Sequence, residues 1–593
     1  MATSQAHPAI STNGRVANPA LDGGRRPSHP LEGQILSGAQ ITCAALEAEG
    51  VDVVFGYPGG AVIPLYDALP SSSLHHVLVR FEQWTALAAD GYARATGRVG
   101  VCMATSGPGA ANLVTGLANA QLDSVPMVAI TGQVSQPMIG KDAFQETDIT
   151  GITLPITKHN YLVQSVEEIA PTIKEAFLLA RSGRPGPVLV DIPKNVFVEK
   201  SRFTYAEVAE RRGYQPSFQP NMRQVRLAAD LINRAKKPVI MAGHGIMLAK
   251  AEEAFAQFVE KSGMPVIFTL LGQGSFPESH PLAFGLMGMH GHREVNMALQ
   301  QADLLINIGA RFDDRATGMI AGFAPNATII HVDIDPAEIG KNVKTDVPVV
   351  GDAGEALRLL LPEIDRRNHD EWVDWIRGQA DVALLRALEQ PREWPEAYTI
   401  IKAIAEATKG EAIVTTDVGQ HQMWTAQHFG FDHPNRWLTS GGLGTMGYGF
   451  PSAIGAKLGC PDMEVWTVVG DGGFQMSSNE LATAVQEGLD INIAVMNNGY
   501  LGMVRQWQDL FHAKNYSEVK ILGPDFVRLA EAYGATGIRV TRAEEIMPAI
   551  QLARSTPGPV VIDFVIEPEA NVWPIVPPGA SNSDMLLHRF EDH

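Results

Sequence analysis

The sequence has few cysteines, fewer basic than acidic residues, and no long apolar run. Three cysteines among 593 residues (Cys43, Cys102 and Cys460) cannot build a disulfide framework and lack metal-ligand spacing, so a reducing cytoplasm fits best. The net charge of −19 excludes the basic surface that nucleic-acid binding needs. No apolar run approaches the ~20 residues of a membrane-spanning helix. The remaining classes are those of an ordinary globular protein, large enough for several domains.

The first 33 residues are rich in proline, glycine, serine and alanine and lack the apolar segment of a secretory signal. We predict a disordered tail over residues 1–33. An organellar transit peptide is the alternative, because this segment is poor in acidic residues and contains several arginines.

The chain contains one segment twice. Residues 99–120 (VGVCMATSGPGAANLVTGLANA) align without a gap on residues 463–484 (MEVWTVVGDGGFQMSSNELATA), and both halves later reach a PGPV strand. Each copy reads as strand, glycine turn and helix, which predicts two related α/β domains. The alternative is that the match reflects only the general similarity of all α/β units. Between the copies, short apolar runs alternate with helical patterns and predict a third unit with a parallel sheet.

The fold class is therefore α/β, with three doubly wound parallel-sheet domains of which the first and third are related. We expect linkers near 201–222 and 366–397. The predicted organisation is a first domain over 34–205, a middle Rossmann-like domain over 220–365, a third domain over 395–568, and a C-terminal tail over the active site at 569–593.

Two neighbouring strands of the third domain end in polar residues beside glycine. EVWTVV stops at Gly470-Asp471-Gly472, and INIAVM stops before Asn498. Ligands of open parallel sheets lie beyond the carboxyl ends of the strands, so Asp471 and Asn498 should point into one crevice, on strands separated by one crossover helix. One carboxylate, one amide oxygen and one backbone carbonyl form the oxygen-only set that Mg²⁺ prefers, with water or phosphate completing it. The alternative is two ordinary turns.

Two further motifs are ambiguous when taken alone. GLGTMG at 442–447 fits G-x-G-x-x-G and would suggest a Rossmann dinucleotide site, a weak signal. Glu82 ends the apolar run VLVRF and starts the helical pattern QWTALAADGYARATG. Its bland interpretation is a carboxylate at a helix N-terminus, worth up to ~1 kcal/mol.

GDG followed by NN resembles the diphosphate- and magnesium-binding motif of thiamine diphosphate enzymes, whose fold has three α/β domains with the first and third alike. RFEQWTALAADGYAR, around Glu82, resembles the activating glutamate motif of the same enzymes. Over about residues 34–590 the resemblance narrows to the catalytic subunits of the acetohydroxyacid synthase (acetolactate synthase) family. It rests on FGYPGGAVIPLYDAL, MIGKDAFQET, GARFDDRATG, HVDIDPAEIGKN and LGMVRQWQ.

This resemblance implies that pyruvate is decarboxylated on thiamine diphosphate and that its hydroxyethyl unit is ligated to pyruvate or 2-ketobutyrate. The products are 2-acetolactate or 2-aceto-2-hydroxybutyrate, which feed branched-chain amino-acid biosynthesis. A 2-keto acid also needs a cation, which Arg315 or Lys194 could supply, although each could be a surface ion pair. A flavin-redox pyruvate oxidase of the same fold stays open. A glyoxylate carboligase is disfavoured because that family lacks the glutamate found here as Glu82, and a non-catalytic scaffold by the intact site residues.

The resemblance also assigns roles to residues. Glu82 would bind the pyrimidine nitrogen of the cofactor, Arg315 the carboxylate of the second substrate, and Trp507 would favour 2-ketobutyrate. The implied thiamine diphosphate site is Glu82, Gln420, His421, Gly444, Met446, Asp471, Gly472, Gly473, Asn498, Tyr500, Gly502 and Met503, with Mg²⁺ on Asp471, Asn498 and the Tyr500 carbonyl. The implied substrate site is Gly60, Glu82, Phe144, Gln145, Lys194, Arg315 and Trp507. The implied site for a structural FAD is Met289, His290, Gly291, Arg311, Asp333, Ile334 and Asp352.

The family places such sites between domains of two chains, so the resemblance implies a homodimer or homotetramer and a separate regulatory subunit. The sequence departs from the family at the rim of the substrate channel. Ser135, Gln136 and Pro137 stand where Pro-Arg-Arg is usual, and Pro578 stands where a small polar residue is expected. Losing two guanidinium groups removes donors for an anionic inhibitor, so we expect insensitivity to sulfonylurea and imidazolinone herbicides.

Overall fold

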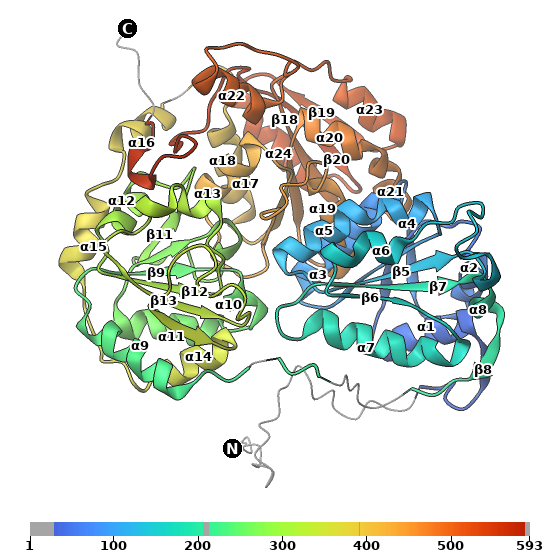
Figure 1. Ribbon diagram of the computed structural model, residues 1–593. Helices are drawn as coiled ribbons and strands as arrows, with labels where there is room; N and C mark the ends of the chain where they lie inside the picture. The colour runs from blue at the N-terminus through green and yellow to red at the C-terminus, as the bar shows by residue number, and fades with distance from the viewer. Residues whose placement is uncertain (1–28, 206–212, 217, 391, 588–593) are drawn as a thin grey trace, which may run out of the picture.

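The computed structural model describes residues 29–205, 213–216, 218–390 and 392–587. These residues form three six-stranded parallel sheets, each covered by helices on both faces, and Figure 1 shows them as three lobes. The three-domain α/β fold predicted from the sequence is confirmed. Most of the predicted N-terminal tail, residues 1–28, lies outside the described residues. Among the helices of the described part, none is long and apolar enough to cross a bilayer.

The first domain is coloured blue to cyan in Figure 1. Its elements are β1 (Ile35–Ser37), α1 (Gly38–Ala48), β2 (Val53–Gly56), α2 (Ile63–Ala68), β3 (His75–Leu78), α3 (Glu82–Thr96), β4 (Gly100–Ala104), α4 (Pro108–Asn112), α5 (Val114–Asp123), β5 (Met127–Gln133), α6 (Ile149–Thr153), β6 (His159–Leu162), α7 (Ile169–Arg181), β7 (Pro187–Pro193), α8 (Lys194–Val198) and β8 (Lys200–Arg202). The sheet order is β3-β2-β4-β5-β7-β6, and β1 pairs separately with β8. The central strands β5 and β7 are buried along their whole length, as expected for a parallel sheet covered on both faces.

The third domain, orange to red, repeats this arrangement. Its elements are α17 (Ala397–Thr408), β15 (Ile413–Thr416), α18 (Gln420–His428), β16 (Trp437–Leu438), α19 (Gly449–Gly459), β17 (Val465–Gly470), α20 (Asp471–Ser477), α21 (Leu481–Gln486), β18 (Ile491–Asn497), α22 (Gly502–Phe511), α23 (Phe526–Tyr533), β19 (Thr536–Val540), α24 (Ile546–Ser555) and β20 (Val560–Val565). The sheet order is β16-β15-β17-β18-β20-β19. Strands β4 and β17, which begin the two repeated segments, therefore occupy the same place in their sheets, as do the PGPV strands β7 and β20. The predicted relation between the outer domains is confirmed.

The middle domain, green to yellow, has the sheet order β11-β10-β9-β12-β13-β14. Its elements are α9 (Met222–Arg234), β9 (Pro238–Ala242), α10 (Gly245–Leu248), α11 (Glu252–Ser262), β10 (Val266–Phe268), β11 (Ala283–Leu286), α12 (Arg293–Gln301), β12 (Leu304–Ile308), α13 (Asp314–Thr317), β13 (Thr328–Asp333), β14 (Val347–Val350) and α14 (Ala353–Leu360). The short apolar runs read from the sequence between the two copies form β9, β10, β12 and β13. The short edge strands β11 and β14 were missed, because only part of each is buried and neither forms a long apolar run.

Three local expectations are corrected by the structure. The crossover from β17 to β18 is not one helix but α20, a short 3₁₀ turn (Ser478–Glu480) and α21. Strand β3 ends at Leu78, so three residues separate it from Glu82 at the start of α3. The segment expected as a linker at 366–397 contains two helices, α15 (Asp370–Arg377) and α16 (Val382–Leu388).

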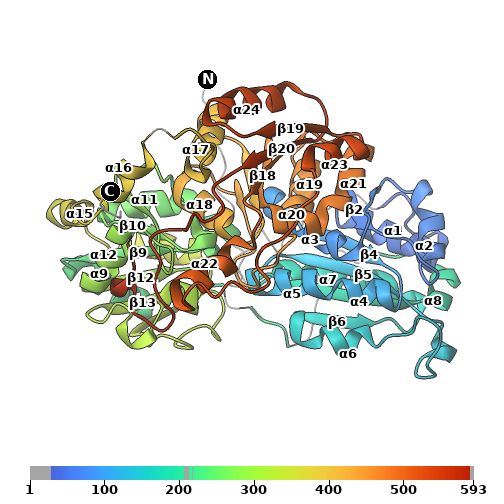
Figure 2. The same cartoon turned by 90° about the horizontal axis from the view of Figure 1, so that it is seen from above.

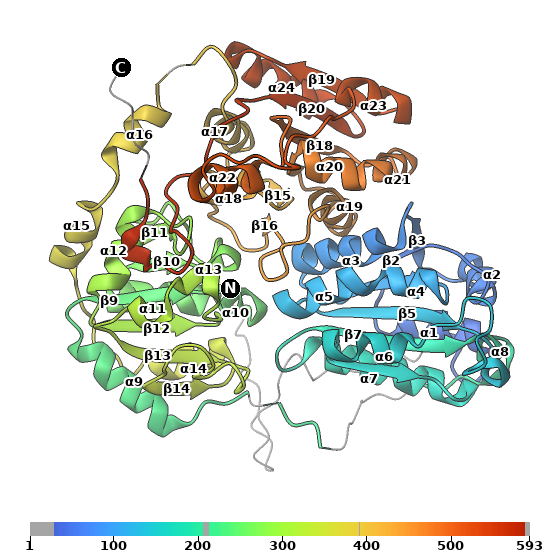
Figure 3. The same ribbon diagram turned by 45° about the horizontal axis from the view of Figure 1, so that its top comes forward.

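The first and third domains meet where α3 crosses α19, and the two helices lie side by side in Figures 2 and 3. Glycines allow this close approach. A Cβ atom on Gly91 would lie 2.1 Å from the carbonyl oxygen of Ser452, and one on Gly455 would lie 1.8 Å from the carbonyl oxygen of Ala88. Because helix α3 begins with Glu82, this crossing fixes that carboxylate relative to the third domain.

Candidate active site

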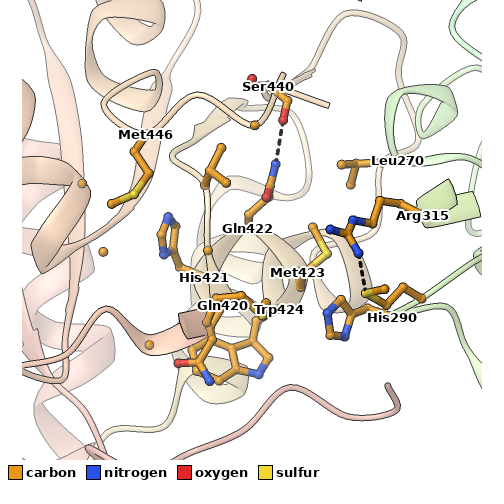
Figure 4. A pocket seen from close by; sticks show the side chains of 18 of the residues that line it. Leu270, His290, Arg315, Gln420, His421, Gln422, Met423, Trp424, Ser440 and Met446 are labelled. Carbon is orange, nitrogen blue, oxygen red and sulfur yellow. Dashed lines mark hydrogen bonds between the residues drawn. The ribbon is translucent and has the colours of Figure 1, made fainter. Parts of the chain in front are cut away.

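A cavity of about 610 Å³ lies between the middle and third domains. Its walls come mainly from loops that follow β11 and β12 in the middle domain and β15, β16, β17 and β18 in the third. These are the carboxyl ends of parallel strands, where open α/β sheets bind ligands. Figure 4 shows Arg315 and His290 on one side of this pocket and Met446 on the opposite side. Among the residues that the structure describes, the lining comes from the middle and third domains, and the first domain contributes none.

The proposed magnesium ligands lie together in the pocket. The backbone N–H of Gly499 donates to Asp471 Oδ2 at 2.9 Å, and that of Tyr500 donates to Asn498 Oδ1 at 3.0 Å. Asp471 is buried, and burial raises the pKa of its carboxyl to about 7. Within the described residues, no group of three His, Cys, Asp or Glu side chains could hold a metal. One carboxylate with amide and carbonyl oxygens fits Mg²⁺, whose remaining ligands are usually waters and substrate phosphates.

Helix α18 begins at the pocket and presents two polar side chains there. Gln420 Nε2 donates to Gln506 Oε1 at 2.9 Å and to the Ala570 carbonyl at 2.7 Å. His421 Nε2 is buried and has no hydrogen-bond partner among the described residues. Burial lowers the pKa of His421 to about 3, so this imidazole is neutral. This unpaired buried nitrogen at the N-terminus of α18 is a polar group whose hydrogen bond a molecule bound in the pocket would complete.

Glycines of the GDGG turn and Gly502, at the start of α22, leave room for neighbouring side chains. A Cβ atom on Gly473 would lie 2.3 Å from Asp417 Oδ2, and one on Gly502 would lie 2.1 Å from Gln420 Oε1. A Cβ atom on Gly472 would contact the Leu501 side chain at 2.8 Å. A side chain at any of these positions would displace the neighbouring side chain, and glycine keeps the backbone close to the pocket.

Asp417 was not identified from the sequence. It follows β15, is fully buried, and accepts hydrogen bonds from the backbone N–H groups of Val418 and Gly447. Its Oδ2 has no hydrogen-bond partner within the described part of the chain, and burial raises the pKa of the carboxyl to about 7. Asp417 holds the end of the loop that carries Gly444 and Met446. The signal that pointed to Asp471, a strand-ending aspartate near glycine, could have found it.

The pocket also brings together Arg315 and Trp507, from α13 and α22. The guanidinium carbon of Arg315 lies 5.7 Å from the centre of the Trp507 ring, within the range of a cation–π contact. Arg315 Nη1 also contacts Met289 Sδ at 3.6 Å. The Arg315 side chain is 62% exposed, so its guanidinium remains accessible to a carboxylate. Gly444 (φ +71°) and Met446 line the pocket with Met503, near the magnesium set.

The candidate residues of the first domain lie apart from this pocket. Glu82 Oε2 accepts a hydrogen bond from Asn112 Nδ2 at 2.9 Å, and a Cβ on Gly109 would be 3.3 Å from Glu82 Oε1. Gln145 has a positive φ of 59° and packs against the turn that contains Gly107. The other three candidates of this group, Gly60, Phe144 and Lys194, are exposed, and Phe144 is 89% exposed. These residues follow strands of the first sheet, so they form a second group at its own carboxyl edge.

The FAD candidates divide between two places. Met289 and His290 line the pocket beside Arg315, and Gly291 is packed tightly against the Met287 backbone. Asp333 and Ile334 stand at the end of β13, and Asp352 caps α14 by accepting from Glu355 N at 3.1 Å. Asp333 Oδ1 accepts from Asp335 N at 2.9 Å. Arg311 follows β12 and reaches Gly442 of the third domain. The carboxylates at this edge keep free lone pairs, which suit ribose or ribityl hydroxyl groups.

The residues that depart from the family lie on a 3₁₀ turn (Gln136–Met138) of the first domain and in the C-terminal segment. The Gln136 side chain donates to the Gln164 carbonyl and accepts from Asn195 Nδ2. Pro137 and Pro578 are exposed, and Ser135 is half-buried. None of these side chains offers a positive charge.

Comparison with known proteins gives matches along most of the chain. Three family models match: the N-terminal TPP binding domain of thiamine pyrophosphate enzymes over residues 36–152, the central domain over 225–360, and the C-terminal TPP binding domain over 417–564. Together they cover more than half of the sequence.

Curated relatives match over nearly the full length. The acetolactate synthase large subunit of Corynebacterium glutamicum is 52% identical over 562 residues, which cover 93% of this chain and 90% of the relative. The acetolactate synthase isozyme 2 large subunit of Escherichia coli is 46% identical, over 93% of this chain and 99% of the relative. The probable acetolactate synthase large subunit of Methanocaldococcus jannaschii is 46% identical, over 93% and 95%.

Proposed function

Because the chain belongs to the acetolactate synthase family of thiamine pyrophosphate enzymes, we propose that its pocket joins two 2-keto acids. Pyruvate loses CO₂, and its two-carbon remainder is ligated to pyruvate or 2-ketobutyrate, giving 2-acetolactate or 2-aceto-2-hydroxybutyrate. The family match over nearly the whole chain is the observation that carries this function, and it favours carboligation over flavin-redox oxidation of pyruvate.

The cofactor is thiamine diphosphate, in line with the two matched binding domains. When bound, it supplies the carbon nucleophile and the electron sink for decarboxylation. Asp471, Asn498 and the Tyr500 carbonyl would hold Mg²⁺ at the diphosphate, and His421 Nε2 would contact the diphosphate. The backbone around Gly444 and the side chain of Met446 would position the rings.

The substrate is held by the opposite wall of the pocket. Arg315 would bind the carboxylate of the second keto acid, and its contact with the Trp507 ring keeps both groups at the same place. The indole would pack against the extra methylene of 2-ketobutyrate, a difference worth ~1–3 kcal/mol. We further propose that FAD has a structural role at Arg311, Asp333 and Asp352, with no net redox part.

The site is completed by a second copy of the chain. Glu82, which would hold a proton at the pyrimidine ring, does not line the pocket of its own chain. Apolar side chains are exposed around both groups of residues, including Phe144 and Leu154 in the first domain and Met476 in the third. A dimer that seats the first domain of one copy over the pocket of the other would cover them and supply Glu82. Gly60, Phe144, Gln145 and Lys194 would reach the substrate in the same way.

Mixing two inactive variants tests this arrangement. Glu82→Gln and Asp471→Ala should each abolish activity alone. In a mixed dimer, one site combines both substitutions while the other combines an intact Glu82 with an intact Asp471. Random mixing should therefore restore about a quarter of the parent activity. If each site lies within one chain, every site in the mixture carries one substitution and no activity returns.

The reaction itself is tested with the purified protein, pyruvate, Mg²⁺, thiamine diphosphate and FAD in one vessel. Acetolactate formation without oxygen uptake is the expected result. Oxygen uptake with acetate or acetyl phosphate as product would assign the chain to the oxidases instead. The relatives are named large subunits, so we also propose a separate small regulatory subunit. A cytoplasmic location is supported by three free cysteines.

A further inference from the structure

A buried polar cluster joins the first domain to the loop at residues 439–447, which we call the pocket loop because much of it lines the pocket. The cluster centres on Arg94, whose Nε contacts Asp90 Oδ1 at 2.6 Å and whose Nη2 contacts Asp123 Oδ2 at 2.7 Å. The side chains of both aspartates are fully buried, and that of Arg94 is 5% exposed. Two carboxylates face one guanidinium, so one negative charge needs another partner.

The pocket loop supplies that partner. The backbone N–H groups of Gly441 and Gly442 donate to the two carboxylate oxygens of Asp123, at 3.0 and 2.6 Å. A side chain at either position would crowd its neighbours, because a Cβ on Gly442 would lie 2.8 Å from Asp123 Oδ1 and one on Gly441 would lie 2.7 Å from Leu271 Cγ. Arg94 Nη1 donates to the Thr439 carbonyl at 3.1 Å. A charged pair of the first domain therefore binds the start of the loop through its backbone.

Asn119, on the same helix as Asp123 (α5), binds both ends of the pocket loop. Asn119 Oδ1 accepts from Ser440 Oγ at 2.6 Å and from Thr445 Oγ1 at 3.0 Å. Ser440 Oγ in turn accepts from Thr445 N at 2.9 Å, which closes the loop on itself. Asn119 is oriented by its own hydrogen bond to Asp90 Oδ2 at 3.1 Å. Figure 3 shows the loop between β16 and α19 descending beside α5, the helix that carries Asn119 and Asp123.

The middle domain closes this junction. His244 is half-buried, and the burial of its ring together with the nearby Arg94 lowers its pKa to about 4. The His244 ring also hydrogen-bonds the backbone of Asp123. The guanidinium of Arg311 lies beside Gly442. All three domains therefore meet at one end of the pocket loop.

We infer that Asp123 and Asn119 are positioning residues, through which the first domain holds the pocket loop in the shape that receives thiamine diphosphate in the same chain. The inference rests on the proposed function for the identity of the ligand. The inference gives the first domain two roles. Helix α3 begins with Glu82, which is proposed to complete the pocket of the partner chain, and Asp90 and Arg94 of the same helix help to anchor the pocket loop of their own chain.

The test uses the full-length protein with Asp123→Asn, which keeps the shape but cannot accept from both glycine N–H groups. Hydrogen exchange of residues 439–447, measured without cofactor, should accelerate about tenfold, the loss of one charged hydrogen bond. The Kd for thiamine diphosphate with Mg²⁺, measured by calorimetry, should rise about tenfold as well. The kcat at saturating cofactor should change little, whereas general damage to the fold would lower it.

Two variants keep the outcome interpretable. Thr445→Val removes one hydrogen bond to Asn119 without touching a charge and should raise both quantities by a smaller factor, about threefold. If Asp123→Asn does not fold, Thr445→Val alone tests whether these contacts hold the pocket loop. Asp52→Asn is the matched control, because Asp52 pairs with Arg98 and Tyr92 of the same domain and makes none of the loop contacts.

Unchanged exchange of the pocket loop in folded Asp123→Asn and Thr445→Val overturns the inference, and so does faster exchange with an unchanged Kd. If the parent protein does not bind thiamine diphosphate, the proposed function fails instead. That result is separate, because the exchange measurement needs no cofactor.

Discussion

The contact between α3 and α19 gives the most direct prediction, because a single methyl group should disturb it. Gly455→Ala would place a Cβ atom 1.8 Å from the carbonyl oxygen of Ala88. The backbone oxygen cannot rotate away, so the helices must separate by about 1 Å. Overpacking of this kind costs about 3 kcal/mol, which corresponds to a fall of about 6 °C in the unfolding midpoint. Activity should also fall, because α3 positions Glu82 at one end and the pocket-loop anchor at the other.

The assay is thermal unfolding followed by circular dichroism, together with acetolactate formation at saturating cofactor. Gly378→Ala is the control, because Gly378 ends α15 with helical dihedral angles and a Cβ there would be 3.4 Å from its nearest neighbour, an ordinary contact. That variant should be neutral or more stable by about 0.5 kcal/mol. An unfolding midpoint within about 1 °C of the parent for Gly455→Ala would refute the claim that this crossing requires glycine.

Three further predictions concern the substrate, the pH dependence of stability and the channel rim. Trp507→Leu should lower the preference for 2-ketobutyrate over pyruvate about tenfold in a competition assay, and an unchanged product ratio would remove the indole from substrate selection. Asp191 is buried, and burial raises the pKa of its carboxyl from 3.8 to about 7. Between these values the folded protein keeps a proton that the unfolded chain releases, so stability falls as the pH rises through this window. The difference in free energy of unfolding between Asp191→Asn and the parent should therefore be more favourable to the variant at pH 8 than at pH 5. Denaturant titrations that give the same difference at both pH values would contradict this. The parent should resist sulfonylurea herbicides at concentrations about tenfold above those that inhibit an Arg-Arg homologue, and Gln136→Arg with Pro137→Arg should lower that concentration. Identical inhibition curves for the parent and the double variant would contradict the role given to these positions.

Much of the fold could be predicted because its signals are local. The strand that ends in Gly470-Asp471-Gly472 and the one that ends before Asn498 are short apolar runs with clear stops, and both lie at the same edge of one sheet. The repeat at 99–120 and 463–484 predicted that the outer domains are related, and their strand orders are equal. The edge strands β11 and β14 escaped prediction because their residues are partly exposed, and so did α16, which has no buried residue. Helix α15 was missed although its apolar residues Trp372, Val373 and Ile376 form one buried face that could have indicated it.

The sequence indicated residues that line the pocket, such as Asp471 and Asn498, more readily than the residues that hold the pocket in shape. Asp471 and Asn498 stand beside glycines in turns, a pattern that favours ligands, whereas Asp123 reads as an ordinary acidic residue at the end of a helix. Its partners, Gly441 and Gly442, lie more than 300 residues away in another domain. Such pairs are decided by how folded domains meet, and no local period or propensity encodes that. Burial then makes them consequential, since without the two N–H donors Asp123 would keep only Arg94 as a partner, and Arg94 is shared with Asp90. Substitutions in the helix that anchors the pocket loop are therefore expected to alter the function of the pocket as substitutions in the loop do, even though only the loop lines the pocket.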